Sequence, residues 1–373
     1  MTHTTLSSPS WVAAYPRRDN ATQHEIATHV CLARKLAQLL QCDVLEPFRP
    51  NSPQAQAACY YVPDETLIAP LHARQLGIQD ASQFFGGMVP YEFVASKAIS
   101  HGLCHPTHDA PANWSHALTE SLADAVLAGY TAFSKHDALQ AGAALLERGP
   151  LRIKPVHARA GQGQRVVHHL GELRHAIAGL TDCQRGVVLE ENLSDVETYS
   201  VGWCHIGSHT LAYVGTQALT QDNHGQDVYG GSYLRCVRGE PVALLELDMT
   251  PATRLAVKLA LHYDAAVNAA YPALVASRRN YDIALGQSAC GTARAGVLEQ
   301  SWRAGGASIA EAAALLFLAQ HPDCSEIDAW TRERYGAAAS PADTDEVVFH
   351  GEDDQVGVML KTSGIVRGNH GRP

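Results

Sequence analysis

Two acidic residues on neighbouring predicted strands constrain the fold of this chain more than any other feature. Residues 281–285 and 297–300 have strand character, and the Gly-, Ser- and Ala-rich residues 286–296 between them predict a turn. Asp282 lies on the first strand and Glu299 on the second. Two carboxylates that face each other across strands can hold a hard cation such as Mg²⁺, which prefers oxygen ligands. They can equally be ordinary solvent-exposed acids of a hairpin, because no fixed ligand spacing accompanies them.

The residues after Glu299 add a positive charge and the start of a helix. Arg303 follows four positions later, residues 305–306 predict a glycine turn, and Ser308 opens a Ser-x-x-Glu pattern that is typical of a helix N-terminus. A helix N-terminus beside an arginine favours a phosphorylated or carboxylate ligand. Residues 280–308 therefore predict a site at which two acids, a basic residue and a helix N-terminus converge.

The composition predicts a folded protein that does not bind nucleic acid. The chain has 373 residues, 46% of them hydrophobic and 18% charged, which is enough for two or three domains or subdomains. The net charge of −10 argues against nucleic acid as a main partner, because phosphate neutralisation needs a basic surface. No apolar run of about 18 residues predicts a membrane span, and the N-terminus lacks the pattern of a secretory signal. We therefore expect a cytoplasmic protein without a membrane partner.

The cysteines and histidines do not match a known metal or disulfide pattern. The nine cysteines are widely spread without a CxxC pair, which is typical of reduced thiols. One cluster contains His101, Cys104, His105 and His108. Its spacing differs from that of structural zinc sites and Pro106 interrupts it, so a polar loop is favoured over a zinc site.

The N-terminal part of the chain predicts a small α/β domain. Apolar residues at helical spacing predict a helix over residues 24–41, and two short strands follow it. The Gly-Gly turn within residues 84–90 either brings backbone amides to a ligand or packs tightly against a neighbouring segment. Prolines and polar residues over 106–114 predict a linker, so we place this domain at residues 1–110.

Residues 151–167 predict two strands joined by a glycine loop. Lys154 lies at the end of the first strand, and Gly161 and Gly163 lie in the loop before the second strand. The lysine supplies charge and the glycines let backbone amides approach oxygens, so this arrangement can hold a polyphosphate. It is not a P-loop, because the GxxxxGK[ST] spacing is absent and the loop leads to a strand. The alternative is a plain hairpin with a surface lysine.

The remaining elements predict three further parts of the chain. Helix, strand, loop, strand, helix and strand alternate over residues 135–193, which predicts a compact lid-like α/β unit. Residues 194–330 follow with antiparallel strands, a helix, the acidic hairpin and another helix, and they form one domain with the lid over 111–330. Residues 216–239 are polar and Gly-rich and predict an active-site loop. Residues 331–373 are interpreted as a C-terminal extension.

The order of these features resembles a known superfamily. A strand lysine with a glycine loop, a strand that ends in Glu-Glu-x-Leu, a further Glu, and late strands with Asp and Glu resemble the ATP-grasp superfamily over residues 115–320. The segments LRIKP, VLEENL and LEQSWRAGGAS make the whole chain similar to a bacterial family with a domain-of-unknown-function label. The resemblance implies an α/β (α+β) fold, in which a small N-terminal α/β pre-ATP-grasp domain precedes an ATP-grasp domain. It also implies a nucleotide site like that of glutathione synthetase.

The resemblance implies roles for the residues of the nucleotide site. Lys154 would contact the α- and β-phosphates, and the loop with Gly161 and Gly163 would cover the phosphates. The segment with Glu190, Glu191 and Leu193 would bind adenine mainly through backbone groups. Glu197 would hold the ribose hydroxyls. Lys135, just before the lid, corresponds to an earlier nucleotide lysine.

The resemblance also implies a metal site and a transfer site. Asp282 and Glu299 would hold Mg²⁺, with Mn²⁺ as an alternative, and Arg303 with Lys154 would act on the transferred phosphate or the substrate carboxylate. The superfamily has Glu-x-Asn on the second metal strand, whereas this chain has Ser301 in the asparagine position. A serine can ligate Mg²⁺ through its hydroxyl or through water, so Ser301 is included in the metal site. The position two residues before the first metal acid, an arginine in relatives, is an asparagine here.

The activity implied by the resemblance is an ATP-dependent ligase that forms C–N bonds. A small-molecule carboxylate would react with ATP to give an acyl phosphate, and an amine or a thiol would then displace phosphate. The alternative is an ATP-binding module without ligase activity, in a sensing or scaffolding role, and the serine at position 301 favours it slightly. The sequence leaves a homodimer open as the oligomeric state.

Overall fold

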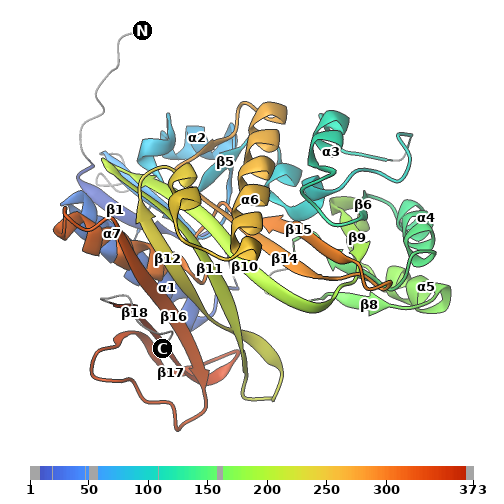
Figure 1. The fold of residues 1–373 in the computed structure, drawn as a ribbon. Coiled ribbons are helices and arrows are strands. Elements are labelled where there is room, and N and C mark those ends of the chain that lie inside the picture. The colour runs from blue at the N-terminus through green and yellow to red at the C-terminus, as the bar shows by residue number, and fades with distance from the viewer. Residues whose placement is uncertain are drawn as a thin grey trace.

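The computed structural model describes residues 9–18, 20–46, 48–49, 58–107, 109–157 and 163–366. Within these residues the chain forms four β-sheets, the largest of which has eight strands and runs through the middle of the molecule (Figure 1). Helices cover both faces of this large sheet, and a smaller sheet with two helices lies at one end of it. This mixture of elements confirms the predicted α/β (α+β) class.

The N-terminal elements form a parallel three-stranded sheet in the order β2-β1-β3, with one long helix packed on it. Helix α1 begins after Thr22, because the Thr22 side chain and the Glu25 side chain cap each other's backbone N–H groups. One face of α1 is buried, and its leucines pack against β1 and β3. The elements are β1 (Trp11–Tyr15), α1 (Gln23–Leu40), β2 (Asp43–Leu45) and β3 (Cys59–Pro63).

A second small sheet, in the order β13-β5-β4, joins the N-terminal part to the rest of the chain. The Gly-Gly turn contributes to this junction: Gly87 N–H donates to the Trp302 carbonyl at 2.7 Å, and Gly86 N–H donates to Ser277 Oγ at 3.1 Å. A Cβ at Gly86 or Gly87 would lie within 2.8 Å of Trp302 atoms, so only glycine fits. Tight packing is therefore what this turn provides. The elements of this region are β4 (Leu67–Ile68), α2 (Leu71–Leu76), η1 (Ala81–Gln83), β5 (Gly87–Val89), η2 (Glu92–Ala95), η3 (Lys97–Ser100), α3 (His116–Leu122) and β13 (Val275–Ala276).

Residues 129–191 form a compact unit with its own hydrophobic core, which we call the lid. Its antiparallel sheet has the order β6-β9-β7-β8, and leucines, isoleucines and alanines from this sheet and from two helices make up its core. The lid lies at the end of the large sheet that carries β14 and β15 (Figure 1). Its elements are β6 (Gly129–Ala132), α4 (Lys135–Leu146), β7 (Leu151–Pro155), β8 (Arg165–Val167), α5 (Leu170–Ala178), η4 (Cys183–Arg185) and β9 (Val187–Glu191).

The large sheet is antiparallel throughout and has the order β15-β14-β10-β11-β12-β16-β18-β17. One face packs against α6, and the other packs partly against α1 and α7. The rest of that second face is polar and includes the acidic pair. The elements are β10 (Ser194–Ile206), β11 (His209–Gln221), β12 (Asp227–Arg238), η5 (Pro241–Glu246), α6 (Pro251–Ala270), β14 (Arg278–Gln287), β15 (Ala293–Gln300), α7 (Ser308–Gln320), β16 (Glu326–Tyr335), β17 (Glu346–Asp353) and β18 (Gly357–Val366).

Two expectations about this region differ from the structure. Residues 216–239 are not a long loop but belong largely to β11 and β12, because their polar side chains alternate along paired strands. The expected boundary at residue 330 falls inside β16, and strands β17 and β18 continue the large sheet beyond it. A buried ion pair of 2.7 Å between Lys361 and Glu333 ties β18 to β16.

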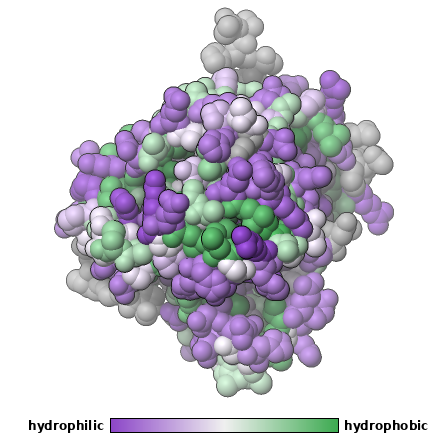
Figure 2. Space-filling model, turned by 90° about the vertical axis from the view of Figure 1, so that its right-hand side faces the viewer, coloured by the Kyte–Doolittle hydropathy of each residue, from purple (hydrophilic) through white to green (hydrophobic). Residues whose placement is uncertain are grey.

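The surface on the lid side is mainly hydrophilic, with one hydrophobic area near its centre (Figure 2). None of the helices in the described part of the chain is both long and apolar enough to cross a lipid bilayer.

Candidate functional site

The two predicted metal acids lie directly opposite each other at the edge of the large sheet. Asp282 on β14 and Glu299 on β15 are register partners in the antiparallel pair, and a bulge follows Asp282. Burial, followed by the negative charge of Glu299, raises the pKa of the Asp282 carboxyl above its ordinary value. The fold therefore brings two carboxylates close enough to repel each other, which is an arrangement that a cation would relieve.

Three hydrogen bonds fix the orientation of Asp282. Its Oδ1 atom accepts from Ser200 Oγ at 2.8 Å, from Gln217 Nε2 at 3.0 Å and from Asn280 Nδ2 at 3.1 Å. Within the described part of the chain, the Ser200, Gln217 and Asn280 side chains all donate to Oδ1. The donors therefore hold one oxygen against the sheet and leave Oδ2 for another partner.

Glu299 has a lysine partner from the N-terminal part of the chain. Lys97, in η3, is buried, and its Nζ lies 2.5 Å from Glu299 Oε2. Burial alone would raise the pKa of Glu299, but Lys97, followed by Lys154 and Arg303, lowers it below its ordinary value. Three cations thus act on one carboxylate at the edge of the sheet.

Lys154 on β7 is held by a buried glutamate of the neighbouring strand β9. Its ammonium forms an ion pair with Glu190 Oε1, and His101 Nε2 lies 3.3 Å from Glu190 Oε2. Burial would raise the pKa of Glu190, but Lys154 and then His101 lower it to about 2. Glu190 is therefore ionised over the whole physiological range, and its ion pair holds the lysine of β7 in place.

The segment after Glu299 approaches the same place. The charge of Arg303 acts on Glu299, and Arg303 Nη1 also donates to the Ala304 carbonyl at 2.8 Å. The backbone of Ser301 forms two hydrogen bonds with Asn280, at 2.7 and 3.0 Å, which extend the pairing of β14 and β15. Ser301 therefore lies two residues beyond the acidic pair, on the same face as Glu299 because side chains alternate.

Residues 192–193 connect the lid to the large sheet, because β9 belongs to the lid sheet and β10 to the large sheet. Glu191 forms a backbone bond to Ala128 at 2.8 Å, and its Oε1 accepts from Ala128 N–H at 3.0 Å. The Leu193 side chain is buried with Leu127 and Ala284. The Glu-Glu-x-Leu segment is thus the crossover between the lid and the large sheet, and its two ends are held by different sheets.

The structure does not bring two of the predicted nucleotide residues to the acidic pair. Lys135 is exposed at the start of α4, and its Nζ donates to the Ala178 carbonyl at 2.8 Å. The Glu197 carboxylate accepts from the Tyr199 hydroxyl at 2.9 Å, and Tyr199 packs in the α6 cluster on the face opposite to Asp282. The roles of Lys135 and Glu197 in nucleotide binding remain predictions.

The glycine loop and the histidine cluster are only partly described. Gly163 has a φ of +68°, in the left-handed region that favours glycine, whereas Gly161 lies outside the described residues, as does His108 of the histidine cluster. Among the residues that the structure describes, no three His, Cys, Asp or Glu side chains are grouped so that they could hold a metal ion. Instead of joining a zinc site, His101 binds Glu190, and Cys104 packs beside the lid core.

Sequence reasoning missed Lys97 and the donors around Asp282. The chain has six lysines, and Lys97 stands within the mainly apolar segment VASKAIS, where a buried charge would need a partner. A single charged residue among apolar neighbours was the pattern from which a role for Lys97 could have been suspected. Ser200, Gln217 and Asn280 gave no such signal, because single polar residues on strands are common and only the strand order brings these three together.

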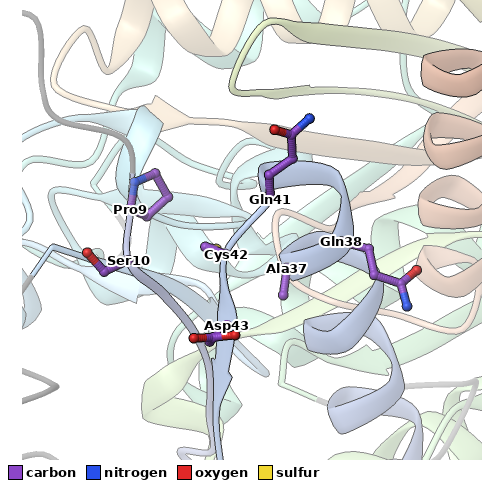
Figure 3. Close-up of a pocket in the computed structure, with 7 residues that line it drawn as sticks. All are labelled: Pro9, Ser10, Ala37, Gln38, Gln41, Cys42 and Asp43. Atoms are coloured by element: carbon purple, nitrogen blue, oxygen red, sulfur yellow. The ribbon is translucent and has the colours of Figure 1, made fainter.

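A depression elsewhere on the molecule is separate from this site. It has a volume of about 440 Å³ and lies beside the end of α1 (Figure 3). Ser10, Cys42 and Asp43 place it at the amino ends of β1 and β2. Ligands of open α/β sheets bind at the carboxyl ends of parallel strands, so this depression does not have the position of a substrate site.

Comparison with solved structures identifies the fold. N5-carboxyaminoimidazole synthetase from Staphylococcus aureus, complexed with ADP, aligns with a TM-score of 0.53 at 9% identity and covers 97% of this chain and 95% of its own. Carboxyaminoimidazole ribonucleotide synthase from Aspergillus clavatus, complexed with ATP, has a TM-score of 0.49 at 13% identity and covers 95% and 93%. D-alanyl-alanine synthetase A from Vibrio cholerae has a TM-score of 0.44 at 11% identity and covers 79% and 89%. The chain has the ATP-grasp fold with a small N-terminal α/β domain, as its sequence predicted.

Comparison with sequences places the chain in a family. A search of curated proteins gives no match. The family model described as protein of unknown function (DUF3182) matches residues 12–363, which is nearly the whole chain. The protein therefore belongs to the DUF3182 family.

Proposed function

We propose that this protein is an ATP-dependent ligase that joins a small-molecule carboxylate to an amine or a thiol. The observation that carries the proposal is the charge arrangement at the edge of the large sheet. Asp282 and Glu299 oppose each other, and Lys97, Lys154 and Arg303 act electrostatically on Glu299. Such a set of charges suits a nucleoside triphosphate with its cation, because cations attract the phosphate oxygens and carboxylates attract the metal. The Staphylococcus aureus structure with the same fold, which is described as an ADP complex, supports a nucleotide as the ligand.

The acidic pair fits Mg²⁺, with Mn²⁺ as an alternative. Asp282 uses Oδ1 for its three donors, so Oδ2 can face a cation shared with Glu299. Among the described residues, no third carboxylate, histidine or cysteine joins Asp282 and Glu299, so phosphate oxygens and water would complete the coordination. Ser301 would contribute at most a weak ligand. When bound, the cation would neutralise negative charge on the β- and γ-phosphates.

The positive side chains would stabilise the charge that moves during phosphoryl transfer. An oxygen of the substrate carboxylate attacks the γ-phosphorus, the bond from that phosphorus to the bridging oxygen breaks, and ADP leaves. Lys154 and Arg303 would hold the transferred group, and Lys97, released from Glu299 when the cation binds, would hold a phosphate oxygen. The amine or thiol then attacks the acyl carbon, loses its proton to solvent, and inorganic phosphate leaves.

We further propose that the nucleotide lies between the lid and the large sheet, within an ATP-grasp domain that begins near residue 111 and extends past residue 330 through β17 and β18. The crossover at Glu190, Glu191 and Leu193 would contact adenine through its backbone. Gly163 would let the loop of the lid follow the phosphates. Closure of the lid would exclude water from the acyl phosphate and so limit its hydrolysis.

The proposal is tested by calorimetric titration with ATP in the presence of MgCl₂. A ligand at 100 times its dissociation constant stabilises a protein by about 2.7 kcal/mol, so a thermal shift gives an independent readout. We expect the wild type to bind, and Lys154→Met and Glu299→Gln to lose at least about tenfold in affinity. Lys258→Met is the matched control, because Lys258 is exposed on α6 at the other face of the sheet. Wild-type protein that binds no ATP would contradict the proposal.

The alternative, a non-catalytic ATP-binding module, is favoured by one observation, namely that Ser301 occupies the asparagine position of the superfamily pattern. Phosphate release distinguishes the two functions. A ligase should release phosphate from ATP only when a suitable carboxylate and nucleophile are both present. Tight ATP binding without phosphate release over broad pools of carboxylates, amines and thiols would support the binding module.

A further inference from the structure

A buried polar network runs behind the acidic pair, from strand β14 to helix α7. It consists of Arg278, Glu311, Tyr213, Asn280 and Asp282, and we call it the Arg278 network. The first four side chains are almost completely buried. Burial of so many polar groups is costly unless each is paired, so the network is expected to have a specific role.

The guanidinium of Arg278 uses all five of its N–H groups. Nε and Nη2 donate to the two carboxylate oxygens of Glu311, and Nη2 also donates to the Tyr213 hydroxyl at 3.1 Å. Nη1 donates to the carbonyls of Ser301 at 2.9 Å and Arg303 at 2.7 Å. Arg278 therefore fixes the backbone that follows Glu299, and a lysine could not replace it because it lacks the planar, five-donor group.

Tyr213 continues the network to the acidic pair. Its hydroxyl lies 2.8 Å from Glu311 Oε1 and 2.8 Å from Asn280 Oδ1. Because the oxygen of the Asn280 amide faces this hydroxyl, its nitrogen faces the other way and donates to Asp282 Oδ1. The hydroxyl accepts from Arg278 and has one proton, which Glu311 Oε1 and Asn280 Oδ1 can each accept. When it donates to Asn280, it and the Asp282 carboxylate both favour the amide orientation that presents a donor to Asp282.

We propose that Tyr213 and Arg278 are positioning residues for the metal-binding carboxylate Asp282, acting through Asn280. The inference rests on the proposed function, because it assumes that Asp282 and Glu299 hold the cation of ATP. The network keeps Asp282 Oδ1 occupied, which would leave Oδ2 for a cation, and Arg278 fixes the backbone carbonyls of Ser301 and Arg303. Loss of the Tyr213 hydroxyl would leave Asn280 Oδ1 without this partner and so hold less firmly the amide that donates to Asp282.

The test compares two buried tyrosines whose hydroxyls each contact a carboxylate. Tyr213→Phe removes the link to Asn280. The control Tyr281→Phe removes a hydroxyl that donates to Asp264 and accepts from Trp302 Nε1 on the α6 side of the sheet. Both tyrosines are completely buried. ATP affinity is measured by titration calorimetry with excess EDTA and again with excess MnCl₂, and the ratio of the two dissociation constants gives the enhancement by metal. We expect Tyr213→Phe to lose about tenfold of this enhancement while its metal-free affinity and the enhancement of Tyr281→Phe stay at the wild-type values.

A purely structural role would weaken ATP binding equally with and without metal. An equal loss, or an enhancement in Tyr213→Phe that matches the Tyr281→Phe control, would overturn the inference while leaving the proposed function intact. Wild-type protein that binds ATP without any enhancement by Mn²⁺ would overturn the metal site and the inference together. If Tyr213→Phe does not fold, Asn280→Ser gives the same readout, because it removes the amide that links the tyrosine to Asp282.

Discussion

The Glu190 carboxylate has an effect on stability that depends on pH. Its pKa in the folded protein is about 2, against an ordinary value of 4.5. A carboxyl group whose pKa is lower in the folded protein stabilises the fold at every pH above its ordinary pKa. This stabilisation is lost as the pH falls to the pKa of the folded protein. The wild type should therefore lose stability between about pH 4.5 and about pH 2. Glu190→Gln should already have lost about 3 to 5 kcal/mol near neutral pH, because it leaves the Lys154 ammonium buried without its partner.

Urea denaturation near neutral pH and at about pH 3 checks this prediction. The control is Glu197→Gln, which replaces an exposed carboxylate and should behave like the wild type. If Glu190→Gln kept the wild-type stability near neutral pH, the ion pair with Lys154 would not have the importance that we give it.

Lys97 should affect metal binding and ATP binding in opposite directions. In the structure its ammonium is the partner of Glu299, so it competes with any cation for that carboxylate. Lys97→Met should bind Mn²⁺ more tightly in the absence of nucleotide, yet should bind ATP with Mg²⁺ about tenfold more weakly, or 1.4 kcal/mol, because a phosphate partner is lost. Electron paramagnetic resonance of free Mn²⁺ and calorimetry with ATP measure the two effects. A variant that weakened both would indicate damage to the site instead of competition.

The proximity of some candidate residues could be predicted where they lie on recognisable strands, while their roles stay predictions. Asp282, Glu299 and Lys154 come together as the sequence suggested, since each lies on a strand next to a glycine-rich turn. Lys97 was not predictable as a member of the site, because only tertiary packing brings it to Glu299. Lys135 resembled a nucleotide lysine by its place in the chain, yet its ammonium binds the end of α5.

At the scale of elements, strand β15 is positioned by close contact with the backbone before the lid. A Cβ on Gly296 would lie 2.5 Å from Leu127 N and 2.7 Å from the Val126 carbonyl carbon, and Val297 N–H donates to the Ala125 carbonyl at 2.8 Å. Gly296→Ala must therefore move β15, which carries Glu299 three residues further on. We expect a loss of about 1 to 3 kcal/mol in stability and a weaker ATP affinity.

Chemical denaturation and ATP titration of Gly296→Ala measure the two effects. The matched control is Gly179→Ala at the end of α5, where an added Cβ would have ordinary contacts of 3.5 Å or more and φ is in the usual negative range. Stability equal to the wild type in Gly296→Ala would mean that β15 can shift freely and that its position does not depend on this contact.

The helices were easier to predict than the strands. An apolar face at helical spacing predicted α1, and the structure places it at Gln23–Leu40, within a residue of the expected range at each end. The polar residues of β11 and β12 suggested a loop, because a strand with many polar side chains has a composition similar to that of a loop. Their pairing depends on neighbouring strands that are distant in sequence, which local patterns do not report.

At the scale of the whole molecule, the N-terminal part and the large sheet share one hydrophobic core. Val12, Leu32 and Tyr60 from the N-terminal elements pack in the same cluster as Leu211 of β11 and Leu315 of α7. This shared cluster crosses the expected division at residue 110, although the N-terminal part also has a second cluster, around Tyr15, Tyr61 and Phe84, that consists of its own residues. The main cluster of the lid contains no residue of the large sheet, so we expect the lid to be the part of the molecule that opens separately.

This arrangement predicts two classes of hydrogen exchange. The strands β1, β3, β10 and β11 should exchange through the same global unfolding, because their side chains share one core. The strands β7 and β9 should exchange through a separate opening of lower free energy, and ATP with Mg²⁺ should slow that opening because the nucleotide would bind lid and sheet together. Native-state exchange followed by mass spectrometry at increasing denaturant separates the classes, since only global unfolding depends steeply on denaturant. If β1 and β3 opened independently of β10 and β11, the shared core would not act as one unit. If ATP left the exchange of β7 and β9 unchanged, the lid would not be part of the nucleotide site.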